Sequence, residues 1–176
     1  TEHFKKSISK KSDLEMDFFT KLYIAENAAK GGGDIAYAIN QLEKIVVDPK
    51  YAKYKSQAMN TLAAILAQSN TEKAITLYKK SIENTENKEL TQKAVAFANL
   101  GDLYYNQTHF ELAKMTYDSA SFFGTTPPID NINEVNLRKV VLTDVVMHIN
   151  TIRTQDSMQM LSKKSDKEQK AAARRE

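Results

Sequence analysis

Two side chains that could do chemistry together are Asp144 and His148. They are four residues apart in a segment with helical periodicity, which places both on one face of a helix. Such a pair could ligate a metal ion or act as an acid–base couple. No third ligand has suitable spacing, because His3 and His109 lie in different segments. We therefore predict no metal site and expect a hydrogen bond instead, within the helix or to a neighbour; a metal hydrolase is the alternative.

Three consecutive polar residues, Gln155, Asp156 and Ser157, also invite a catalytic interpretation. No partnered base or oxyanion-stabilising element accompanies them, so we expect a cap or kink in the C-terminal helix. Gly31–Gly33 lack the Lys-Ser/Thr of a phosphate-binding loop and do not follow a strand, which predicts a flexible turn. The chain contains no cysteine, which excludes disulfides and thiolate chemistry. We predict no catalytic residue, no cofactor and no small-molecule substrate.

The composition favours a mostly helical protein. The 176 residues are 41% hydrophobic and 27% charged, with only 5 Gly and 3 Pro. The net charge of +3 comes largely from the two ends, so no nucleic-acid partner is expected. No segment approaches the length of apolar sequence that spans a bilayer. The absence of an initiator Met and of a signal-peptide pattern indicates a processed chain or a piece of a longer protein.

Apolar residues recur at helical spacing between clear stop signals. Capping-box patterns at Ser12, Ser69 and Thr108, each followed by Glu three residues later, predict helix starts, and Asp34 predicts another. The predicted helices run from residue 12 to the glycines, from 34 to about 48, from 54 to 68, from 69 to about 83, from 88 to 106, from 108 to about 123, and from 133 to 154 with a continuation or kink through Met158 and Leu161.

These helices form pairs that repeat along the chain. The second helix of each pair carries a leading alanine, at positions 38, 74 and 113, so the offsets are 36 and 39 residues. An internal period in this range is typical of a helical solenoid. The third pair resembles the tetratricopeptide repeat most closely. We predict an all-α, tetratricopeptide-like solenoid over residues 1–124, with helix pairs at about 12–50, 54–83 and 88–124, a long capping helix at 129–162 and a charged helical or frayed tail at 163–176.

Small residues define where the paired helices touch. Two antiparallel helices approach closely only where one lacks bulk, so Gly101 and Ala113 are predicted as the contact points. Tyr104 and Tyr117 are expected to fill the space on either side, and Ala120 to admit the next helix. The full set of predicted packing residues is Leu62, Ala63, Ala74, Tyr78, Leu100, Gly101, Tyr104, Ala113, Tyr117 and Ala120.

The first helix of each pair lines the concave surface of such a solenoid and presents a polar, amide-rich strip there. Such a strip suits the backbone of a bound peptide. It lacks the concentrated Lys and Arg of a clamp for C-terminal carboxylates. The alternatives are a solvated face, or a groove covered by the chain's own Phe4–Ile8 segment. The predicted partner-binding residues are Gln57, Asn60, Thr61, Asn99, Asp102, Tyr105 and Asn106.

The second half of the chain carries a more specific pattern. Tyr117-Asp118-Ser119 is followed by the Pro127-Pro128 break, then by a helix with Ile152, Gln155-Asp156-Ser157 and Met158, and by a basic end. From residue 99 to residue 176 the chain resembles the tetratricopeptide-repeat lipoproteins of Bacteroidota type IX secretion and gliding motility, of the SprE/PorW type.

The resemblance implies a lipoprotein on the periplasmic side of the outer membrane, with an anchor cysteine upstream of this sequence. It also implies a non-catalytic role in assembling or coupling parts of the secretion and gliding machinery, with periplasmic components as partners. The alternative is a cytosolic tetratricopeptide adaptor that binds peptide segments. The basic tail is expected to be a solvated helix, with contact to an acidic partner or a membrane surface as the alternatives.

Overall fold

The computed structural model describes residues 2–85, 89–125 and 128–165, and every regular element within these ranges is helical. The protein is therefore all-α, as predicted. The elements are α1 (Glu2–Ala29), α2 (Ile35–Val47), a 3₁₀ helix (Pro49–Tyr54), α3 (Lys55–Leu66), α4 (Thr71–Asn84), α5 (Leu90–Asn106), α6 (Phe110–Phe123) and α7 (Ile132–Ser162).

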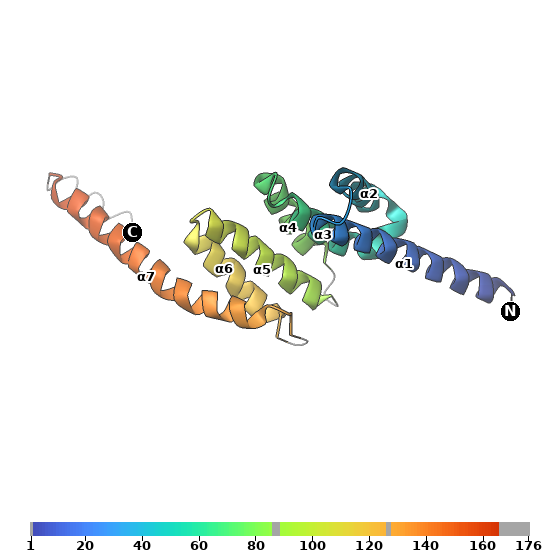
Figure 1. The fold of residues 1–176 in the computed structure, drawn as a ribbon. Helices are drawn as coiled ribbons and strands as arrows, with labels where there is room; N and C mark the ends of the chain where they lie inside the picture. Colours follow the sequence, from blue (N-terminus) through green and yellow to red (C-terminus); the bar gives the residue numbers. More distant parts are fainter. Residues whose placement is uncertain (1, 86–88, 126–127, 166–176) are drawn as a thin grey trace.

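The helices form three successive hairpins, α1/α2, α3/α4 and α5/α6, and each hairpin packs on the next through α2–α3 and α4–α5 contacts. The first helices also contact one another, α1 against α3 and α3 against α5. The result is an elongated solenoid, from one end of which the first half of α1 projects, while α7 extends from the other (Figure 1). The backbone of residues 4–8 thus points away from the hairpins, which argues against the alternative that this segment covers the groove (Figure 1).

One continuous apolar core runs through the hairpins because every helix buries one face. Phe18 of α1 stacks on Tyr54 with ring centroids 4.4 Å apart, and Tyr78 and Tyr117 are completely enclosed in the later hairpins. Every residue predicted to pack between helices is buried: Leu62, Ala63, Ala74, Tyr78, Leu100, Gly101, Tyr104, Ala113, Tyr117 and Ala120.

The close approach at Gly101 differs in its partner from the prediction. A Cβ atom built on Gly101 would lie 2.7 Å from Cε1 of Tyr117 and 3.0 Å from Oγ1 of Thr116. The nearest atoms across the α5/α6 interface therefore belong to Tyr117 and Thr116, whereas Ala113 was expected to meet Gly101. The glycine provides space for an aromatic ring, so a small residue faces a large one.

The capping patterns located some helix starts and misplaced others. Asp34 does cap α2, since its side chain accepts a hydrogen bond of 3.0 Å from the Tyr37 backbone N–H. The start predicted at Ser12 is wrong, because α1 begins at Glu2 and passes through this residue. No Gly or Pro precedes Ser12, so nothing in the sequence stops the helix from extending backward. The start predicted at Ser69 is shifted by one residue, as Asn70 caps α4.

Thr108 ends a helix instead of beginning one. Its φ is +59°, and its backbone N–H donates to Tyr105 O at 3.0 Å, while the N–H of His109 donates to Tyr104 O at 2.9 Å. These two bonds and the left-handed residue make a Schellman motif, which satisfies the last carbonyl groups of α5. The capping role predicted for Thr108 is therefore wrong, and α6 begins after His109 without a side-chain cap.

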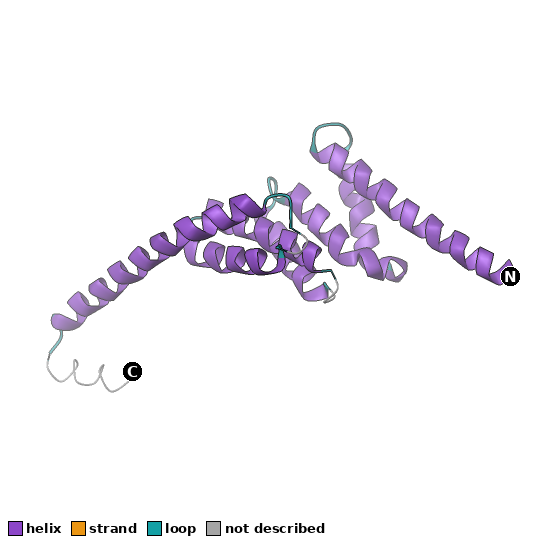
Figure 2. Cartoon of the chain, turned by 90° about the horizontal axis from the view of Figure 1, so that it is seen from below, coloured by secondary structure: helices purple, strands orange, loops and turns teal. Residues whose placement is uncertain are grey.

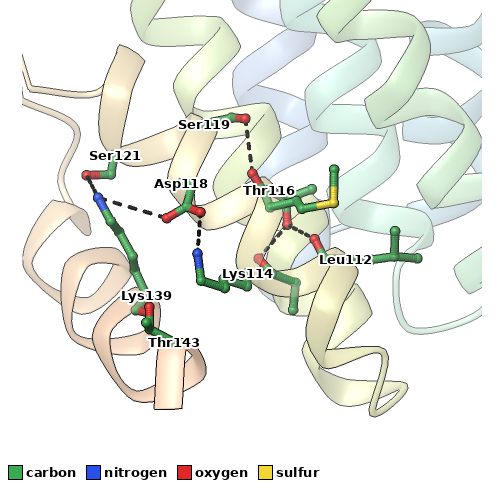
Figure 3. Close-up of polar contacts among 10 residues, drawn as sticks. Leu112, Lys114, Thr116, Asp118, Ser119, Ser121, Lys139 and Thr143 are labelled. Carbon is green, nitrogen blue, oxygen red and sulfur yellow. Dashed lines mark hydrogen bonds and ion pairs between the residues drawn. The ribbon is translucent and has the colours of Figure 1, made fainter. Parts of the chain in front are cut away.

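α7 packs on the last hairpin through its first half, and an exposed ion pair in its second half joins Arg153 Nη1 to Glu111 Oε1 of α6 at 2.9 Å. Leu142 and Val135 are the buried residues of α7. Lys139 reaches α6, where its Nζ lies 3.4 Å from Ser121 Oγ and 3.9 Å from an Asp118 carboxylate oxygen (Figure 3). From Asn150 to Met160 every residue is exposed, and the helix that leads to the C-terminus extends away from the hairpins (Figure 2).

The C-terminal part of α7 departs from one prediction, the cap or kink at residues 155–157. The helix is uninterrupted to Ser162, so Gln155-Asp156-Ser157 neither cap nor break it; the Ser157 hydroxyl donates 2.8 Å to the Arg153 carbonyl oxygen within the helix. Residues 163–165 are exposed, and the rest of the predicted charged tail, 166–176, lies outside the described residues.

Candidate functional site

A shallow depression of about 270 Å³ lies where the first helices of the three hairpins meet. α1 contributes one residue to its wall, α3 contributes four and α5 contributes three. We call this site the amide pocket, because four of its eight lining side chains are amides. It is lined by Glu26, Gln57, Asn60, Thr61, Ala64, Gln92, Val95 and Asn99.

The structure brings four of the seven predicted partner-binding residues together in this pocket: Gln57, Asn60, Thr61 and Asn99. Helical spacing explains their convergence. The lining positions of α3 and of α5 each recur at intervals of three or four residues, so each set forms one face. Because α3 and α5 are first helices of adjacent hairpins and contact each other, their two polar faces become one surface.

Asn60 is the most enclosed polar residue of the pocket, with 5% of its surface exposed. Its Nδ2 donates to the Gln92 carbonyl oxygen at 3.0 Å and lies 3.4 Å from Gln92 Oε1, which ties α3 to α5. Its Oδ1 is buried and accepts no hydrogen bond from any described residue. A buried acceptor without a donor typically costs about 1–3 kcal/mol. Asn60 therefore carries an unsatisfied acceptor that is buried behind the surface of the pocket.

The pocket contains a single ionisable group, Glu26 of α1, which sequence reasoning missed. Its side chain is partly buried, and in the described part of the chain no cation or hydrogen-bond donor contacts its carboxylate. Only the second helix of the first pair was aligned with the other repeats, so no positional signal marked this residue of the first helix. Gln92 and Val95 were missed as well, although they precede Asn99 at helical spacing and share its face.

Asp102 and Tyr105 do not belong to this pocket. Asp102 accepts a 2.5 Å hydrogen bond from the Tyr117 hydroxyl and a second one from the Arg138 guanidinium of α7. The Tyr105 ring packs edge-on against Phe110, with centroids 5.8 Å apart, and Arg138 lies 5.8 Å from its centroid. Asp102 thus links α5 to α6 and α7, while Tyr105 packs on Phe110 of α6 and stays 41% exposed.

Asn106, the remaining predicted residue, is the last residue of α5 and is exposed beside the turn to α6. It lies outside the amide pocket. Four of the seven predicted residues thus line the amide pocket, and Asp102, Tyr105 and Asn106 lie outside it.

Burial keeps the two central tyrosines protonated. Desolvation raises the pKa of Tyr78, which lies next to Asn99, well above its usual value. Desolvation is also the main cause that raises the pKa of Tyr117, and the neighbouring Asp102 carboxylate acts in the same direction. A neutral phenol is a packing group and a hydrogen-bond donor, so neither tyrosine is suited to act as a base.

Asp144 and His148 lie on the exposed side of α7, and no hydrogen bond joins them or links them to another described residue. The hydrogen bond predicted for this pair is therefore wrong. Among the side chains that the structure describes, those of residues 13–85, 89–125 and 128–165, no three of His, Asp or Glu come together as metal ligands.

None of the helices in the described ranges is both long and apolar enough to cross a membrane. No protein-family model matches the chain, and neither a curated protein nor a solved structure is significantly similar to it. The function is therefore inferred from the geometry of the amide pocket and from the sequence resemblance given above.

Proposed function

We propose that the protein is a non-enzymatic scaffold that binds a segment of a partner protein in the amide pocket. The observation that carries this proposal is the convergence of Gln57, Asn60, Gln92 and Asn99 from two helices onto one open depression. An amide side chain offers both a donor and an acceptor, which matches the alternating N–H and C=O groups of a peptide backbone. Ala64 and Val95 add apolar surface for a side chain of the bound segment.

The chemistry of the lining residues also supports binding over catalysis. Amides and the Thr61 hydroxyl do not titrate near neutral pH, so they transfer no protons at a useful rate. Glu26 is the one acid or base among the eight lining residues, and no nucleophile paired with a base accompanies it. These groups orient a ligand by hydrogen bonds and leave it unchanged.

Replacing both Gln57 and Asn99 by Ala is expected to weaken peptide binding by about 5- to 150-fold. Each lost hydrogen bond contributes about 0.5–1.5 kcal/mol, and a 1.4 kcal/mol loss corresponds to a factor of ten. A phage-displayed library of random 12-residue peptides is selected on the unaltered protein, and the affinities of recovered peptides are measured by fluorescence anisotropy.

The matched control is Asn40→Ala, which removes an exposed amide from α2, away from the pocket. Its affinities are expected to equal those of the unaltered protein. Recovered peptides that bind the double variant as tightly as the unaltered protein would place the binding surface elsewhere. Failure to recover any specific peptide would remove the proposal.

The resemblance supports a more specific proposal, namely a periplasmic component of type IX secretion and gliding held at the outer membrane by a lipid anchor. Ile152 and Met158, two of the residues that carry the resemblance, lie on the exposed half of α7, where a partner can reach them. The contrasting candidate is a cytosolic adaptor with the same pocket.

Fractionation of the native cells distinguishes these two candidates. We expect the protein to sediment with the outer membrane and to resist added protease until that membrane is permeabilised. A wholly cytosolic pool would refute the secretion proposal and leave the scaffold proposal intact. Fractionation must be done on the product of the whole gene, because the anchor is expected outside this sequence.

A further inference from the structure

The charge balance of the amide pocket indicates what kind of segment fits it. Among its eight lining residues, one is anionic and none is cationic. We propose that the bound segment presents a Lys or Arg side chain to the Glu26 carboxylate. This inference rests on the proposed function, because it assigns the chemistry of the ligand of the same pocket.

Glu26 differs from two other carboxylates on the first helices in having no counterion within the chain. Asp17 of α1 is paired with Lys21, whose Nζ lies 2.9 Å from its carboxylate, and Asp102 of α5 is paired with Arg138. No described cation is within ion-pair distance of Glu26, although its side chain is partly buried. A partly buried carboxylate attracts a cation more strongly than an exposed one, because less water screens the pair.

The neutral wall of the pocket is also suited to a cation. A Lys ammonium has three donors and an Arg guanidinium has five, and neither accepts a hydrogen bond. Some N–H groups of the bound Lys or Arg would not be bonded to Glu26. Their hydrogen bonds can be accepted by the amide oxygens of Gln57 and Asn99 and by the hydroxyl of Thr61.

An acidic segment is disfavoured by the same arrangement. It would bring a second negative charge next to Glu26, with no lining Lys or Arg to neutralise either group. The pocket is therefore expected to discriminate by the sign of charge, selecting cationic segments and rejecting C-terminal carboxylates.

The test compares parallel selections of the random 12-residue library on the unaltered protein and on Glu26→Gln, which keeps the shape of the side chain and removes its charge. Peptides from the unaltered protein are expected to be enriched in Lys or Arg at one aligned position, and this enrichment disappears with Glu26→Gln. A recovered peptide is expected to bind the variant about tenfold more weakly and with less dependence on salt.

Glu83→Gln is the matched control, because it makes the same change of net charge on an exposed position of α4. It should retain both the enrichment and the affinity. Specific peptides without enrichment in Lys or Arg, or with equal affinity for Glu26→Gln, would overturn the cation assignment and leave peptide binding intact. No difference between the unaltered protein and the Gln57→Ala, Asn99→Ala variant would overturn the proposed function itself.

Discussion

Gly101→Val is expected to lower the free energy of unfolding by about 3 kcal/mol or more, the upper range for overpacking a core. The first added atom would already lie 2.7 Å from Cε1 and 2.8 Å from Cδ1 of Tyr117. That ring cannot turn aside, because it is fully buried and its hydroxyl is bonded to Asp102. For a chain of this length the melting temperature should fall by roughly 6–12 °C, which circular dichroism at 222 nm measures.

Gly101→Ala separates the steric effect from helix propensity. Alanine favours a helix over glycine by about 1 kcal/mol, which opposes the clash, so this variant should lose less stability than the valine variant. Gly33→Ala is the control, because its Cβ would meet Ala28 atoms at 3.6 and 3.7 Å, an ordinary contact. An unchanged melting temperature for Gly101→Val would show that α5 and α6 do not approach each other at this point.

Leu142→Ala is expected to cost about 2–5 kcal/mol, the range for truncating a buried leucine. Leu142 is 1% exposed and is one of two buried residues in the 31 residues of α7. Truncating Leu142 removes much of the apolar contact that holds α7 on the last hairpin. The face of that hairpin covered by α7 would then be open to water. Urea unfolding measures the loss, and hydrogen exchange should show faster exchange of the amides in the first half of α7.

Val141→Ala is the matched control, because Val141 is the preceding residue and is 51% exposed. Its change should remain within about 0.5 kcal/mol, as for other surface substitutions. Equal effects of the two variants would mean that α7 does not depend on Leu142 for its attachment. In that case Val135 and the polar contacts of Lys139, Arg138 and Arg153 would hold the helix.

The sequence by itself determined the helical pairs and their burial. Each helix buries one face, so the alternation of small and large residues at positions such as Ala74 and Tyr78 records which face is inside, independently of its neighbours. Helix starts were less well determined. The start predicted at Asp34 was correct, because the glycines before it exclude other starts. The residue that caps α4 is Asn70, directly after the predicted Ser69. Thr108 lies in the left-handed turn that ends α5.

Only the tertiary structure decided which polar residues remain available to a partner. Periodicity placed Asn99 and Asp102 near the same face of α5, yet Asn99 lines the pocket and Asp102 is held by Arg138, 36 residues away in the sequence. Glu26 had no recognisable repeat position and became part of the site because α1 packs beside α3. A local pattern specifies the direction of a side chain from its own helix, whereas its partners depend on how distant helices pack.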